Sequence, residues 1–150
     1  MKIIEQEEVR KLLQPKDCIQ LMAEALKGLE SGEYAQPARL ITVMPNTAKF
    51  GFMPAYVGDY FGAKVISAFA PNMGTKYPSH IGYVMLFESA HSTVAGMIEA
   101  GSITEIRTGA VSAAATDLLA RKDSHKLALI GAGAQARSHL AAIREIRDIT

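Results

Sequence analysis

The sequence predicts an α/β protein in two parts: a mixed α+β domain with a mostly antiparallel sheet, and then the first β–α unit of a second domain. Three observations support this. Residues 36–99 alternate short β-like runs with Pro, Gly and Asn. Helical patterns flank this region on both sides. An apolar run then meets Gly131 and Gly133 and leads into another helix-forming segment.

The first helical region contains two expected helices. Residues 5–13 predict a short helix that Pro15 stops. Asp17 is expected to cap the next helix, with Gln20 as its capping-box partner, and Ser31 and Gly32 should end it. Apolar residues at helical spacing predict a buried stripe on that helix: Ile19, Met22, Ala23, Leu26 and Leu29.

The middle region should form the sheet, above a helical layer. Turns are expected at residues 46–48 and 89–92, and a longer loop from Pro71 to Ser79. The segments with strand-like composition are residues 38–44, 49–56, 60–69, 81–88 and 93–99.

A third helix follows the sheet and closes the first domain. Ser102 and Glu105 have the spacing of a capping box, and the helix should run to about Arg121. Its interior is rich in Gly, Ala and Ser, which would let another backbone or a ligand approach closely. We therefore expect a substrate and dimerisation domain at residues 1–121, followed by the β–α unit at 126–150.

Composition restricts the function. Of 150 residues, 49% are apolar and 21% are charged, and 16 basic against 15 acidic side chains leave a net charge of +1. With no basic stripe, neither nucleic acid nor a membrane is an expected partner. Cys18 is the only cysteine, which fits a cytoplasmic location without a disulfide framework. No signal peptide is expected at the start, because Glu5 comes too early.

The glycine turn is the clearest functional signal. Gly131 would allow a sharp exit from a strand at Leu127–Ile130, and Gly133 would let the backbone approach an anion. Ala136 takes the third small position. The helix expected at 134–147 would present free N–H groups to a diphosphate, so we favour a dinucleotide over a plain tight turn. The acidic residue that separates NAD from NADP would lie beyond Thr150.

Three cations are candidates for chemistry. Arg39, in the strand 38–44, could hold a substrate carboxylate bidentately, or it could be an edge-strand arginine in solvent. Lys64 lies in an apolar run where desolvation would lower its pKa and suit it to proton transfer; a lysine that reaches solvent is the alternative. Arg107 lies near a helix N-terminus, where a cation suggests a nearby anion or an ion pair with Glu105 or Glu99.

The histidines and the single cysteine do not predict a metal site. His91, His125 and His139 lack zinc-ligand spacing relative to each other or to His80. His80 starts a strand after a loop and is the only histidine that we expect near a functional site.

Together, four motifs resemble the ornithine cyclodeaminase/μ-crystallin family, in the right order and spacing over nearly the whole chain. They are Ala63-Lys64-Val65, Ile103 to Ala110 (ITEIRTGA), Leu119-Ala120-Arg121 and Ile130 to Ala136 (IGAGAQA).

The resemblance implies roles for residues of this chain. Arg39 corresponds to the substrate-carboxylate arginine, Lys64 to the active-site lysine, and Arg107 to the arginine at the junction of substrate and cofactor. Met53 and His80 should line the nicotinamide end of the pocket, with Met53 on the substrate and His80 on the cofactor. The residues expected at the cofactor phosphates are Thr108, Gly131, Gly133, Ala134 and Gln135.

The resemblance also implies a homodimer that pairs through the first domain, and NAD or NADP bound on a Rossmann domain. The leading hypothesis is ornithine cyclodeamination to proline and ammonia, with hydride passing to and from bound NAD. The alternatives are a net redox enzyme on a small amino or imino acid (alanine dehydrogenase, ketimine or pyrroline-2-carboxylate reductase, opine-type dehydrogenase). A protein of another class is a crystallin-like binder of NADP or a small ligand without turnover.

Overall fold

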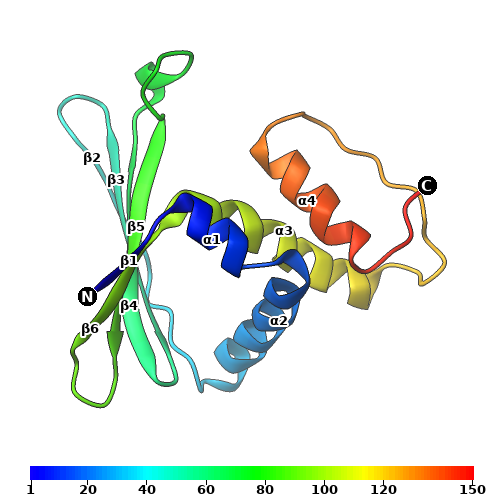
Figure 1. The fold of residues 1–150 in the computed structure, drawn as a ribbon, viewed down its shortest axis with the longest axis horizontal. Coiled ribbons are helices and arrows are strands. Elements are labelled where there is room, and N and C mark those ends of the chain that lie inside the picture. The colour runs from blue at the N-terminus through cyan, green and yellow to red at the C-terminus, as the bar shows by residue number, and fades with distance from the viewer. The chain divides into compact units, whose positions relative to one another are not determined.

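The computed structural model describes residues 1–150 and divides into two compact units. Unit 1 comprises residues 1–9 and 28–101, and unit 2 comprises residues 10–27 and 102–150. Figure 1 shows the sheet of unit 1 and the helices along the chain. The expected division at residues 121–126 concerns a Rossmann domain, and it stays a prediction.

Unit 1 is built on one sheet of six strands in the order β1-β6-β5-β4-β3-β2. The mixed α/β class with a mostly antiparallel sheet is confirmed, because every pair is antiparallel except β1 with β6. The strands are β1 (Lys2–Ile4), β2 (Leu40–Val43), β3 (Lys49–Val57), β4 (Tyr60–Ala68), β5 (His80–Glu88) and β6 (Val94–Glu99).

Local chemistry explains the turns between the strands. Gly58 has φ +56° in the two-residue turn between β3 and β4, a conformation that favours glycine. Asn46 accepts the Ala48 N–H through Oδ1 in the β2–β3 turn. The loop from β4 to β5 contains the short 3₁₀-helix η1 (Ala70–Asn72), and the Asn72 side chain holds it by donating to the Pro78 carbonyl.

The second and third helices begin earlier than their expected caps. The first two are α1 (Gln6–Leu12) and α2 (Pro15–Ser31). Asp17 therefore lies inside the first turn of α2, because Pro15 starts the helix where its missing N–H costs nothing. The buried positions of α2 are Cys18 and Gly28, whereas Leu26 and Leu29 of the expected stripe are exposed.

The third helix, α3 (Ala100–Leu119), also starts two residues before the expected cap at Ser102. Glu99 precedes α3, and its carboxylate accepts the Gly101 N–H, which satisfies one of the free donors of the first turn.

The last helix is α4 (Ala134–Arg144), three residues shorter than expected. The strand expected at Leu127–Ile130 is not formed. A strand needs a partner for its N–H and C=O groups, and none of β1–β6 pairs with this segment. Ile130 is fully exposed. The core of unit 2 instead forms where Ala113 of α3 meets Ala142 and Ile143 of α4.

Candidate functional site

The candidate residues of unit 1 share one face of the sheet. Lys64 pairs directly with Met53 across β3 and β4, and paired residues of an antiparallel ladder point to the same side. His80 pairs with Ala68 of β4. Ala68 lies four residues after Lys64, so both point to the same face, and His80 therefore lies on this face too. Leu40 pairs with Phe52, which places Arg39 one residue before the ladder, beside the Met53 position.

The surroundings of these residues differ. Lys64 and Met53 are half-buried, and β4 is half-buried from Phe61 to its end, so the lysine lies in a partly desolvated strand as expected. Arg39 is exposed and precedes the edge strand β2, which is the geometry of the solvent alternative. His80 is exposed at the start of β5, with its Nδ1 atom 3.3 Å from the Ser79 hydroxyl.

In unit 2, Arg107 lies in α3, and its positive charge acts on the Cys18 thiol of α2. Burial raises the pKa of the Cys18 thiol, and the positive charge of Arg107 offsets part of that rise. Glu105, considered above as an ion-pair partner of Arg107, pairs with Arg10 at 2.6 Å. Thr108 donates its hydroxyl to the Thr104 carbonyl one turn earlier, at 2.5 Å.

The glycine turn has the features of an anion site. Gly131 has φ +101°, a left-handed conformation that other residues adopt only with strain. Gly133 caps α4 without any side-chain hydrogen bond. A Cβ atom added at either glycine would meet no heavy atom within 4 Å. Ala134 and Gln135 in the first turn of α4 are exposed, and no side-chain cap at Gly133 occupies the N–H groups of this turn. A phosphate fits this donor set.

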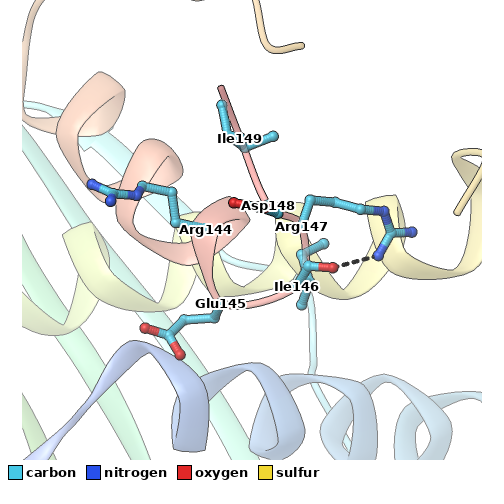
Figure 2. Close-up of a pocket in the computed structure, with 6 residues that line it drawn as sticks. All are labelled: Arg144, Glu145, Ile146, Arg147, Asp148 and Ile149. Atoms are coloured by element: carbon cyan, nitrogen blue, oxygen red, sulfur yellow. Dashed lines mark hydrogen bonds between the residues drawn. The ribbon is translucent and has the colours of Figure 1, made fainter. Parts of the chain in front are cut away.

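A hollow of about 360 Å³ lies elsewhere in unit 2, after the end of α4 (Figure 2). None of the candidate residues lines it. Two arginines and two acidic residues give it no net charge, so it has no clear preference for an anion or a cation. Its lining is Arg144, Glu145, Ile146, Arg147, Asp148 and Ile149.

Sequence reasoning missed a polar contact between α3 and the segment that follows α4. Arg147 donates through Nη1 to Asp117 Oδ1 at 2.6 Å, across thirty residues of sequence. No local pattern signals such a pair.

Comparison with known proteins identifies the family. A family model described as "Ornithine cyclodeaminase/mu-crystallin family" matches residues 1–150. The chain belongs to this family, as the motifs suggested.

Individual relatives support this family assignment. The chain is 36% identical over 121 residues to "Ketimine reductase mu-crystallin" of Mus musculus, covering 79% of this chain and 38% of that protein. In structure it is similar to an archaeal alanine dehydrogenase dimer with bound NAD (TM-score 0.93, 28% identity, 98% of this chain and 46% of that one).

It is also similar to Thermococcus litoralis Delta(1)-pyrroline-2-carboxylate reductase in complex with NADH and L-proline. There the TM-score is 0.92 and the identity 33%, over 99% of this chain and 47% of that one. The chain thus spans about half the length, or less, of the relatives it matches. No helix in the structure combines the length and the apolarity that crossing a bilayer requires.

Proposed function

We propose that this chain supplies substrate- and cofactor-binding residues of an NAD(P)-dependent enzyme that acts on a small amino or imino acid. The observation that carries the proposal is the shared sheet face of Lys64, Met53 and His80, with Arg39 beside it, together with the uncapped N-terminus of α4. The relatives named above are reductases and dehydrogenases, and a lysine cyclodeaminase is also similar in structure.

In this proposal the cations bind and orient. The guanidinium of Arg39 holds the substrate carboxylate, with Arg107 as a second donor. Lys64 donates or accepts a proton near the reacting carbon. Met53, directly opposite Lys64, restricts the room for the substrate side chain.

The cofactor would lie on the other unit. The N–H groups of Ala134 and Gln135 and the open side of Gly131 and Gly133 would hold the diphosphate, with Thr108 beside it. His80 would contact the nicotinamide end. The bound nicotinamide supplies hydride transfer, and the protein supplies orientation and charge.

The reaction type has two candidates. Sequence motifs favoured redox-neutral cyclodeamination of ornithine. The net redox alternative is supported by the identity of the relatives: those above are 36% and 33% identical to this chain and are named as reductases, against 27% for the lysine cyclodeaminase. We therefore propose an imine reductase or amino acid dehydrogenase alongside the cyclodeaminase.

One assay panel separates these reactions. The complete gene product is mixed with NADH or NADPH and pyrroline-2-carboxylate, with NAD+ and alanine, and with NAD+ and ornithine. A net redox enzyme changes the nicotinamide fluorescence steadily with the first or second pair. A cyclodeaminase releases ammonia from ornithine without net change of that fluorescence. Cofactor binding without turnover of any of these compounds would contradict the enzyme and support a crystallin-like binder.

The homodimer is proposed to form through the other face of the sheet. Leu40, Phe50, Phe52 and Ile81 have the opposite parity to Lys64 and Met53 in the ladders. All four are exposed, Leu40 by 61% and Ile81 by 54%. An apolar face of this kind on one sheet is typical of a protein–protein interface.

A further inference from the structure

Helices α3 and α4 approach each other closely at one glycine. A Cβ atom at Gly109 would lie 2.5 Å from the Ser138 carbonyl oxygen and 3.1 Å from the His139 nitrogen. Both are backbone atoms, so no side-chain rotation could relieve the contact. Gly109 therefore sets how near α4 lies to α3. It lies two residues after Arg107 in α3, and its partner Ser138 is the fifth residue of α4.

The contact continues along one face of α3 at intervals of four residues. One turn after Gly109, Ala113 is fully buried against Ala142 and Ile143. One turn later, Asp117 meets Arg147. On the α3 side these two contacts are made by Gly109 and Ala113, which have no long side chain to interlock with α4. A smooth seam of small residues fixes the separation of two helices better than it fixes their register.

The third contact is of a different kind. The Arg147 side chain is only 7% exposed, and its Nη1 atom donates to Asp117 Oδ1 and to the Ile146 carbonyl, each at 2.6 Å. Figure 2 shows the guanidinium of Arg147 and its bond to Ile146. Arg147 Nε is buried without a hydrogen-bond partner. The Asp117 side chain is 43% exposed, so only the arginine of the pair is buried. A buried charge with an unsatisfied donor is poor evidence for added stability, and such pairs are best known for specifying register.

We propose that the Asp117–Arg147 pair is a positioning device for cofactor binding: Arg147, three residues after the end of α4, ties that end of the helix to α3 and so locks the register of α4 against α3. Arg107 and Thr108 lie in α3, and the glycine turn leads into α4, so a slip between the helices would move the diphosphate donors relative to Arg107 and Thr108. A slip of one turn is about 5.4 Å. This inference rests on the proposed function, since it assumes that the turn at Gly133 binds the cofactor diphosphate.

The test replaces the pair by apolar residues of similar size, Asp117→Leu with Arg147→Met, in the complete gene product. Such replacements of buried pairs are often neutral or stabilising, so the melting temperature should stay equal or rise. We expect the Kd for NADH or NADPH, from nicotinamide fluorescence, to rise about tenfold or more. The matched control is Lys122→Met. Lys122 bonds the same Asp117 oxygen at 2.8 Å, but it is exposed and follows α3, so it does not connect α3 to the end of α4 and its loss should leave Kd unchanged.

The outcomes are distinct. Wild-type protein that binds neither nucleotide contradicts the proposed function itself. Wild-type protein that binds, with a folded double variant that binds equally well, overturns only the register inference. If the double variant does not fold, Asp117→Asn is measured instead: it keeps an acceptor for Arg147 but removes the charge. An unchanged Kd in a folded Asp117→Asn protein, together with an unchanged KM for the amino acid, would also overturn the inference.

Discussion

Lys64 lies directly opposite Met53 across the β3–β4 ladder, and Arg39 lies beside the same row, one residue before β2. This row brings a guanidinium, a thioether and an ammonium to one face of a sheet. It gives the proposed substrate site one charged group for a carboxylate, one for a proton and an apolar spacer between them.

Arg39 should contribute to substrate affinity rather than to the chemical step. We expect Arg39→Lys to raise the KM for the amino or imino acid about tenfold, because lysine keeps the charge but loses the bidentate fork. Arg39→Gln should raise KM further. Steady-state kinetics at saturating cofactor measure both, with the Kd for NAD(P)H as the control that should not move. Equal KM values in all three proteins would show that Arg39 is the solvated edge arginine that its exposure allows.

Substitutions at the two glycines of the turn should have different effects on stability and on cofactor affinity. Gly131→Ala places a side chain at φ +101° and should cost about 1–2 kcal/mol of unfolding free energy. Gly133→Ser adds a hydroxyl where the fold leaves open space, and serine is a good helix cap, so stability should hold or rise. Cofactor affinity should nevertheless fall in Gly133→Ser, because the new side chain occupies the proposed diphosphate position. Tight NAD(P)H binding by a stable Gly133→Ser protein would argue against this turn as the cofactor site.

The two faces of β2 offer a matched test of the homodimer. Leu40 and Val43 are exposed by 61% and 64%, but their parity places them on opposite faces of the sheet. Leu40→Glu should dissociate the dimer, because a carboxylate would be buried in an apolar interface. Val43→Glu should leave it intact. Sedimentation velocity of both variants measures the outcome, and a dimer that survives Leu40→Glu would exclude this face.

Protonation of Glu88 should destabilise the β5–β6 hairpin at low pH. Its carboxylate accepts the backbone N–H groups of His91 and Thr93, each at 3.0 Å, and these bonds hold the pKa of Glu88 below the ordinary value of about 4.3. A lowered pKa in the folded state gives stability that is complete above the ordinary value and is lost as the pH falls through the lowered one. Glu88→Gln should therefore flatten the fall of the melting temperature between pH 5 and the acid limit. Glu30→Gln, an exposed glutamate of α2, is the control; an equal effect of both variants would contradict this assignment.

Local patterns predicted most of the sheet. Alternation and turn residues placed β3, β5 and β6 within one or two residues of their observed bounds, because hairpin pairing is local. β1 was missed. It has three residues and pairs in parallel with β6, more than ninety residues away, so nothing near Lys2 indicates it.

The other differences also have physical causes. Asp17 and Ser102 were expected to cap the second and third helices, but α2 begins at Pro15 and α3 begins directly after Glu99. Several nearby residues can satisfy the same free N–H groups, so the sequence alone does not fix which one does. The apolar run at Leu127–Ile130 has strand composition but no partner strand among β1–β6. For the candidate site, strand parity could place Lys64 and Met53 on one face, whereas the pairing of Asp117 with Arg147 depends on how the segment after α4 packs against α3.

The most direct test of the central claim is the turnover of Lys64→Met. Lys49→Met is the matched control: Lys49 lies on the same face, in β3, four residues from the partner of Lys64. We expect Lys64→Met to lower kcat by about 10² to 10⁴, the usual contribution of a positioned acid or base, while the Kd for NAD(P)H stays the same. Lys49→Met should retain wild-type kcat. Full turnover by a folded Lys64→Met protein would contradict the assignment of this lysine to the reaction.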